Sequence, residues 1–202
     1  MATKLTVQFN LFGGTMISLG TERHRKYLPK IDDLSLVGCF ALTELGYGNN
    51  AIEMETTATY DSKTHEFIVN TPSVLAQKYW ITNGAVHAHY SIVFAQTYVN
   101  GKHEGTIDIR EWLQHHRSGI NTFLVPIRDE KLQQLPGVRI DDMGHRMGCN
   151  GVDNGKLFYH NVRIPAENML NKYSDVSRDG VFHSQIPDRR GYVLIYFLVL
   201  VI

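Results

Sequence analysis

Residues 38–50 read G-C-F-A-L-T-E-L-G-Y-G-N-N. The apolar run at 37–42 is short and ends at a turn signal, which favours a buried strand over a helix. Gly46 and Gly48 follow in the turn, and glycine lets backbone N–H groups approach a flat or anionic ligand closely. A strand followed by a glycine-rich turn is also the pattern of an ordinary hairpin. This stretch therefore predicts a strand and a turn, and leaves a ligand site open beside a plain hairpin.

Short apolar segments separated by polar turns continue along the chain. Segments rich in β-branched and aromatic residues are typical of strands, and we expect them at 55–60, 66–70, 77–83, 89–99, 121–127, 137–142, 156–160 and 162–164. Many short strands with turns between them favour a sandwich or a barrel. A short helix, with Thr21 as its cap, is expected to stop before Pro29. The sequence thus predicts mixed α/β content that is mainly β.

Two further segments differ in composition from these strands. Residues 100–118 are polar, charged and rich in histidine, and we interpret them as an insertion or loop with a short helix at 109–116. Residues 191–202 are very apolar, but a dozen residues is well short of the ~20 that span a bilayer. We therefore interpret this end as a core segment or a truncated or altered end, and expect no membrane span.

The composition of the 202-residue chain excludes some classes of function. Its formal net charge is zero, which argues against a nucleic-acid binder that follows phosphates. Cys39 and Cys149 form no C-x-x-C pair, so buried free thiols in a reducing compartment are expected. The first 16 residues lack the pattern of a secretory signal. The histidines include the pairs 87/89 and 115/116, but no spacing brings together the three or four ligands that a metal needs.

Four blocks in a fixed order carry a resemblance to a known family. They are the stretch at 38–50, K-Y-W-I-T-N-G at 78–84, F-L-V-P-I-R at 123–128, and N-G-V-D-N-G at 150–155, which runs into N-V-R-I-P at 161–165. Their order and spacing closely resemble the acyl-CoA oxidases, relatives of the acyl-CoA dehydrogenases, over roughly residues 12–179 of this chain. The resemblance implies a central β-barrel domain at 37–165. Residues 1–36 would end an N-terminal helical domain, and 166–202 would form a linker and the truncated or altered start of a C-terminal helical domain.

A flavin site needs an apolar or aromatic wall and hydrogen-bonding groups along the ring edge. On the residues alone, the aromatics at 40 and 80 read as core and the threonines as ordinary strand residues. The resemblance instead places them against FAD, with Thr43 and Thr82 as the main contacts. The full set of expected cofactor contacts is Phe40, Ala41, Leu42, Thr43, Gly48, Asn49, Trp80, Ile81 and Thr82. Asn49 and Asn50 stand where the dehydrogenases usually have Ser-Asp.

The resemblance also implies a reaction. Acyl-CoA oxidases use FAD to convert a fatty acyl-CoA and molecular oxygen to trans-2-enoyl-CoA and hydrogen peroxide, the first step of peroxisomal β-oxidation, and a homodimer is expected for the full-length family. The family's general-base glutamate would lie beyond Ile202, so no catalytic residue is assigned and this chain alone is expected to be inactive. The chain does not end in the peroxisomal signal Ser-Lys-Leu. An acyl-CoA dehydrogenase fragment that uses an electron-transfer flavoprotein, and a non-catalytic interaction module, are the alternatives.

Two acidic positions invite a functional role that we do not give them. Glu44 lies beside the glycine-rich turn, but we expect its carboxylate to hold the loop by accepting backbone N–H bonds. The motif Asp153-Asn154-Gly155 is a strong turn signal before a strand, and we interpret it only as a turn.

Overall fold

The computed structural model describes all residues except 1, 49, 101, 104–118 and 186–202. The predicted insertion helix at 109–116 and the apolar end at 191–202 lie outside the described residues. The helical elements are α1 (Ala2–Leu5), the π-helix η1 (Thr6–Gly13), α2 (Gly14–Leu19), the 3₁₀ helix η2 (Glu22–Tyr27), α3 (Leu28–Asp32), η3 (Ala51–Glu53) and η4 (Ala166–Asn168). The strands are β1 (Gly38–Ala41), β2 (Thr57–Asp61), β3 (Glu66–Asn70), β4 (Lys78–Thr82), β5 (Tyr90–Val99), β6 (Lys102–His103), β7 (Ile120–Pro126), β8 (Val138–Asp142), β9 (Asn154–Tyr159), β10 (Val162–Pro165), β11 (Ser174–Val176) and β12 (Phe182–Ser184).

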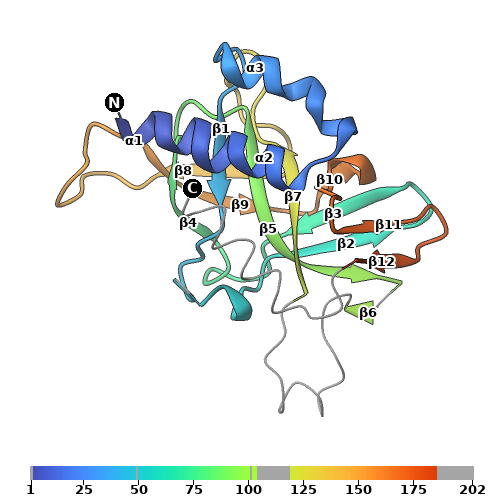
Figure 1. The fold of residues 1–202 in the computed structure, drawn as a ribbon. Helices are drawn as coiled ribbons and strands as arrows, with labels where there is room; N and C mark the ends of the chain where they lie inside the picture. The colour runs from blue at the N-terminus through green and yellow to red at the C-terminus, as the bar shows by residue number, and fades with distance from the viewer. Residues whose placement is uncertain (1, 49, 101, 104–118, 186–202) are drawn as a thin grey trace.

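Strand β5 is the centre of the larger sheet. β7 pairs antiparallel along one edge of β5, while β1 and β2 lie end to end along the other edge, both parallel to β5. β3 and β10 continue the sheet beyond β2, and β4, β9 and β8 form a separate three-stranded sheet. Together the strands make a curled, mainly β fold, with the N-terminal helices across one face (Figure 1). This confirms the predicted fold class.

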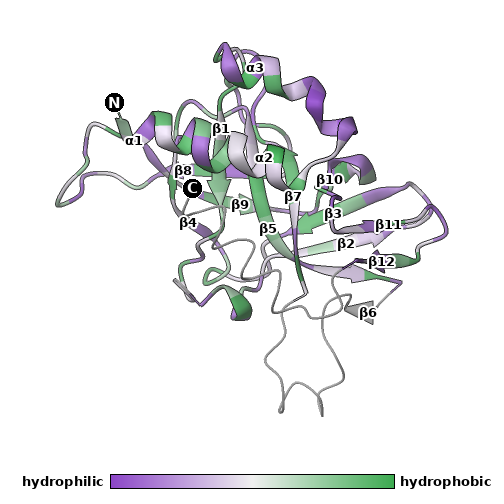
Figure 2. Cartoon of the chain, in the orientation of Figure 1, coloured by the Kyte–Doolittle hydropathy of each residue, from purple (hydrophilic) through white to green (hydrophobic). Residues whose placement is uncertain are grey.

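The interior of β5 and β7 explains why these strands lie at the centre. Much of both strands is hydrophobic (Figure 2), and Val93, Phe94 and Phe123 are completely buried. The rings of Phe67 and Phe123 lie 4.8 Å apart between centroids, in the tilted arrangement that aromatic pairs prefer. A strand buried on both faces is rich in apolar residues on both faces, and residues 92–95 show this pattern within β5.

The N-terminal helix packs directly on β1 because position 38 has no side chain. A Cβ atom at Gly38 would lie 2.3 Å from the ring of Phe12, so only glycine allows this approach. Gln8, which is buried, joins the same two elements: its Oε1 accepts the Gly38 N–H at 2.8 Å, and its Nε2 donates to the Leu36 carbonyl at 2.8 Å. The pocket described below lies beside this contact.

The structure departs from the predicted elements in three places. The turn before β9 lies at residues 150–152, and Asn154 and Gly155 already belong to the strand, so the interpretation of 153–155 as only a turn was wrong. Part of the segment expected to be a linker after residue 165 forms the hairpin of β11 and β12. The 3₁₀ helix η2 does end at Tyr27, but the chain continues directly into α3 with Pro29 in its first turn, where proline is tolerated. No helix among the described residues is long and apolar enough to cross a membrane. Of the two thiols expected to be buried, Cys39 is buried, but Cys149 is exposed, so that expectation was wrong for Cys149.

Candidate functional site

A pocket of about 300 Å³ lies where the N-terminal helix, the end of β1 and β4 meet. Three elements of the chain line it, and the sequence separates them by dozens of residues. The lining residues are Val7 and Leu11 from η1, Phe40, Leu42 and Thr43 from β1 and its end, and Trp80, Ile81 and Thr82 from β4. Six of the nine predicted cofactor contacts are therefore brought together around one space.

The other three predicted contacts do not line this pocket. Ala41 is completely buried in the core, because side chains alternate along a strand and both of its neighbours at 40 and 42 face the pocket. Gly48 has φ of +53° and its N–H donates to the Glu44 carbonyl at 3.0 Å, which closes the turn after β1. Asn49 lies outside the described residues.

Trp80 is not a core residue, which corrects the interpretation from the residues alone. Its side chain is 54% exposed and its φ is +63°, a conformation that bulky residues rarely adopt. The pairing of β4 with β9 is irregular between Lys78 and Ile81, so Trp80 lies at the irregularity. Bulges re-aim a side chain next to a binding site. The indole therefore lines the pocket and adds an aromatic surface there.

The two predicted threonines lie on adjacent elements that are joined by a backbone hydrogen bond. The Tyr79 N–H donates to the Thr43 carbonyl at 2.9 Å, which joins the end of β1 to β4. The Thr82 hydroxyl donates to Asn154 Oδ1 at 2.8 Å. Phe40 packs its ring edge-on against Phe94 at 4.9 Å between centroids. The pocket thus combines two aromatic side chains, apolar side chains and two hydroxyls.

A buried ion pair, which the sequence analysis identified only in part, joins the segments that carry Leu42 and Trp80 of the pocket. Lys78 Nζ donates to Glu44 Oε1 at 2.9 Å, and the two side chains are 0% and 1% exposed. The Glu44 oxygens also accept the backbone N–H groups of Glu55 at 2.8 Å and Thr56 at 3.0 Å. The prediction that Glu44 holds the loop is therefore confirmed, and its carboxylate is unavailable as a base.

Lys78 was not singled out from the sequence, although a lysine at the start of an aromatic strand was the available signal. Its Nζ also donates to the carbonyls of Phe94 at 2.8 Å and Leu42 at 3.2 Å. Burial lowers the pKa of Lys78, and the charge of Glu44 and its hydrogen bond oppose that shift. These contacts fix the ends of β1 and β4 relative to β5, and so fix two walls of the pocket.

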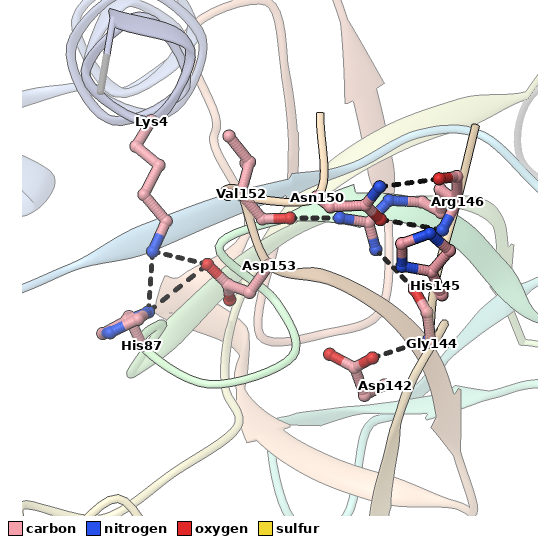
Figure 3. Close-up of a pocket in the computed structure, with 10 residues that line it drawn as sticks. Lys4, His87, Asp142, Gly144, His145, Arg146, Asn150, Val152 and Asp153 are labelled. Carbon is pink, nitrogen blue, oxygen red and sulfur yellow. Dashed lines mark hydrogen bonds and ion pairs between the residues drawn. The ribbon is translucent and has the colours of Figure 1, made fainter. Parts of the chain in front are cut away.

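A second, polar pocket of about 420 Å³ lies near the start of β9 (Figure 3). Lys4 from α1 forms an ion pair with Asp153 at 2.6 Å, and His87 Nδ1 lies 2.9 Å from Lys4 Nζ. Arg146 donates to the carbonyls of Cys149 at 3.0 Å and Gly144 at 3.1 Å, so its guanidinium holds its own loop. Among the described residues, no group of three or more His, Cys, Asp or Glu side chains is arranged to hold a metal ion.

Comparison with known proteins identifies the family. The model of the acyl-CoA dehydrogenase middle domain matches residues 39–162. The chain belongs to this family. The predicted resemblance is therefore confirmed, and the match covers the β strands from β1 to the start of β10.

Individual relatives of this family are acyl-CoA oxidases. The chain is 46% identical over 190 residues to the peroxisomal acyl-coenzyme A oxidase 2 of Arabidopsis thaliana, and this match covers 93% of this chain and 26% of that protein. It is 39% identical to the peroxisomal acyl-coenzyme A oxidase 3 of Homo sapiens, covering 94% of this chain and 25% of that protein. The chain thus spans about a quarter of the length of these relatives.

Solved structures that resemble this chain include acyl-CoA oxidases as well. The acyl-CoA oxidase 1 of Yarrowia lipolytica superposes with a TM-score of 0.85 at 36% identity, covering 98% of this chain and 27% of that one. The acyl-CoA oxidase-2 of Caenorhabditis elegans, solved with FAD, ascaroside-CoA and ATP, superposes with a TM-score of 0.84 at 30% identity, covering 98% of this chain and 27% of that one.

Proposed function

We propose that this chain is the flavin-contacting part of a peroxisomal acyl-CoA oxidase. The reaction is the oxidation of a fatty acyl-CoA by molecular oxygen to trans-2-enoyl-CoA and hydrogen peroxide. The observation that carries the proposal is the pocket in which Thr43 and Thr82 meet the side chains of Phe40 and Trp80. The names of the relatives support the reaction and the peroxisomal location, and a homodimer belongs to the same proposal.

The chemistry of the pocket residues fits a flavin ring. A flat, largely apolar ring with polar atoms along one edge needs an apolar wall and a few hydrogen-bonding groups. Trp80 and Phe40 supply the aromatic surface, the Thr43 and Thr82 hydroxyls supply the polar edge, and η1 closes the space with Val7 and Leu11. When bound, FAD supplies the electron acceptor for the dehydrogenation. The chain's own residues bind and orient the ring and exclude water from one side of it.

The proposal assigns no proton transfer to this part of the protein. None of the eight lining residues carries a carboxylate, an imidazole or an amine. The nearest acidic residue in sequence, Glu44, is buried and paired with Lys78. A group outside this pocket must therefore remove the substrate proton, and we expect the chain alone to bind FAD weakly and to turn over little or no acyl-CoA.

Titration with FAD tests the proposal. We expect the purified chain to quench FAD fluorescence and to give a bound-flavin absorption band. Thr43→Val and Thr82→Val should each weaken FAD binding about fivefold, because each removes one hydrogen bond of about 1 kcal/mol. Thr59→Val is the matched control, because Thr59 lies exposed on β2. A wild-type chain that binds no FAD would contradict the proposal, as would a control that weakens binding equally.

Two other functions share this pocket. The name of the matching family model favours an acyl-CoA dehydrogenase, and the absence of an acid or base among the lining residues favours a binding module without catalysis. Anaerobic addition of an acyl-CoA to the FAD-loaded chain separates these cases. Bleaching followed by oxidation with oxygen indicates an oxidase, while bleaching that needs an electron-transfer flavoprotein for reoxidation indicates a dehydrogenase. Bound flavin without bleaching is the result expected of this chain alone.

A further inference from the structure

The segment 153–155 joins three parts of the site. Asp153 binds Lys4 of the N-terminal helix at 2.6 Å and accepts the Val86 N–H at 3.0 Å. A Cβ at Gly155 would lie 2.9 Å from the Ala85 nitrogen, so glycine lets β9 approach the turn that follows β4. Asn154 lies between these two contacts, and its side chain contacts Thr82, which lines the other pocket.

Asn154 and Thr82 are directly opposite each other in the antiparallel pair of β9 and β4. Opposite residues in such a pair present their side chains on the same face of the sheet. The Thr82 hydroxyl donates to Asn154 Oδ1 at 2.8 Å, and Asn154 is only 7% exposed. In the described part of the chain, this is the only side-chain hydrogen bond that either residue makes.

This contact determines what the Thr82 hydroxyl offers to the pocket. A hydroxyl has one hydrogen and two lone pairs, so when it donates to Oδ1 its lone pairs remain for a ligand that donates. An amide also carries an NH₂ group, and rotation of the Asn154 amide brings Nδ2 to Thr82 Oγ1 as a donor. The Thr82 hydrogen is then free for a ligand that accepts. An asparagine at position 154 supports both arrangements.

We propose that Asn154 is a positioning residue for the cofactor edge, acting through Thr82. This inference rests on the proposed function, because it takes the ligand opposite Thr82 to be a flavin. The oxidised ring presents an acceptor nitrogen at its central edge, and the two-electron reduced ring presents an N–H there. Asn154 holds the Thr82 hydroxyl in place and lets it donate to the first form and accept from the second.

A double-mutant cycle on the full chain tests this role. Asn154→Leu matches the shape of asparagine without its polar atoms, and Thr82→Val does the same for threonine. We expect each single variant to weaken FAD binding about fivefold, as for the loss of one hydrogen bond. The double variant should be no weaker than Thr82→Val, because Asn154 acts only through that hydroxyl. The absorption maximum of bound FAD in Asn154→Leu should move to the position seen in Thr82→Val.

The controls separate positioning from a general loss of structure. Asn168→Leu also removes one side-chain hydrogen bond, from Nδ2 to the Leu124 carbonyl at 2.7 Å, but its partner lies on β7 outside the pocket. It should leave the FAD affinity and the absorption maximum unchanged. Asn154→Ser, whose hydroxyl is too short to replace the amide, is the second variant if leucine disturbs folding, and the same result is expected of it.

The possible failures point to different conclusions. A wild-type chain that binds no FAD overturns both the proposed function and this inference. A wild-type chain that binds FAD, together with Asn154 variants of unchanged affinity and absorption maximum, overturns this inference alone. Additive losses in the double variant also overturn it, because they mean that Asn154 acts independently of Thr82.

Discussion

Two lysine–carboxylate pairs join distant segments of this chain, and they differ mainly in their access to water. The pair of Lys78 and Glu44 is 2.9 Å long with side chains 0% and 1% exposed, whereas the pair of Lys4 and Asp153 is 2.6 Å long with side chains 27% and 9% exposed. The shorter pair is the more exposed one. The N–O distance therefore does not indicate how much each pair contributes to stability. Water screens the charges of the outer pair, Lys4 and Asp153, but not those of the inner pair, Lys78 and Glu44.

The inner pair tolerates burial because its polar atoms all form hydrogen bonds. Lys78 has three donor hydrogens, and it has an oxygen partner for each in Glu44, Leu42 and Phe94. Both carboxylate oxygens of Glu44 accept backbone N–H groups as well. Removing one partner leaves the other charge buried without compensation, which costs far more than the pair contributes in total.

The largest expected effect is that of Lys78→Met. The change leaves the Glu44 carboxylate buried beside two backbone N–H groups, and the free energy of unfolding should fall by about 3–5 kcal/mol. Urea unfolding measures it. Lys63→Met is the control, because Lys63 lies exposed in the turn between β2 and β3. If both variants lose the same stability, burial does not distinguish the two lysines.

Neutralising the remaining charge should recover part of that loss. Adding Glu44→Gln to Lys78→Met removes the uncompensated carboxylate, so the double variant should be more stable than Lys78→Met by about 1–2 kcal/mol. The same urea series gives this difference. A double variant less stable than the single one would mean that the Glu44 contacts to residues 55 and 56 matter more than its charge.

A smaller, pH-dependent effect is expected of Asp153→Asn in the outer pair. Burial raises the Asp153 pKa, but the hydrogen bonds from Lys4 and Val86 and the charges of Lys4 and His87 together outweigh it, so the net pKa lies below its ordinary value of 3.8. The carboxylate therefore stabilises the fold above pH 3.8, and this is lost as the pH falls through the lowered pKa. The variant should be about 1 kcal/mol less stable near neutral pH. A deficit that persists in strong acid would contradict this.

The smallest expected effect is that of Lys4→Met. An ion pair that water reaches contributes about 0.2–1 kcal/mol, and salt reduces this contribution. Urea unfolding in low salt and in about 1 M NaCl should show a small difference from wild type that disappears in high salt. Lys30→Met, at an exposed position in α3, serves as the control. A loss that is equal in both salt conditions would indicate packing of the lysine stem rather than charge.

The strands were predictable because their signal is local. Residues 66–70 form β3 as predicted, and the strands expected at 89–99 and 121–127 match β5 and β7 within a residue or two. The hairpin of β11 and β12 was missed because it consists of short polar segments. The turn signal at 153–155 misled because Gly155 serves a close approach of β9 to the turn after β4, and that approach is visible only in three dimensions.

The candidate site was predictable only in part for the same reason. The resemblance placed Thr43 and Thr82 beside one ligand, and they do line one pocket, where they remain proposed cofactor contacts. The exposure of Trp80 depends on the irregular pairing of β4, which composition does not reveal. Val7 and Leu11 were missed because a helix far away in the sequence supplies them. Asn154 was missed because its partner is a hydroxyl on a neighbouring strand.

The absence of a side chain at Gly38 lets the N-terminal helix approach β1 closely beside the pocket. The helix that carries Val7 and Leu11 rests on β1 where Phe12 meets Gly38, so Gly38 controls the spacing between these two walls of the pocket. A methyl group there would act as a spacer, lifting one wall from the other. The width of the pocket therefore depends on a residue that is not among those lining it.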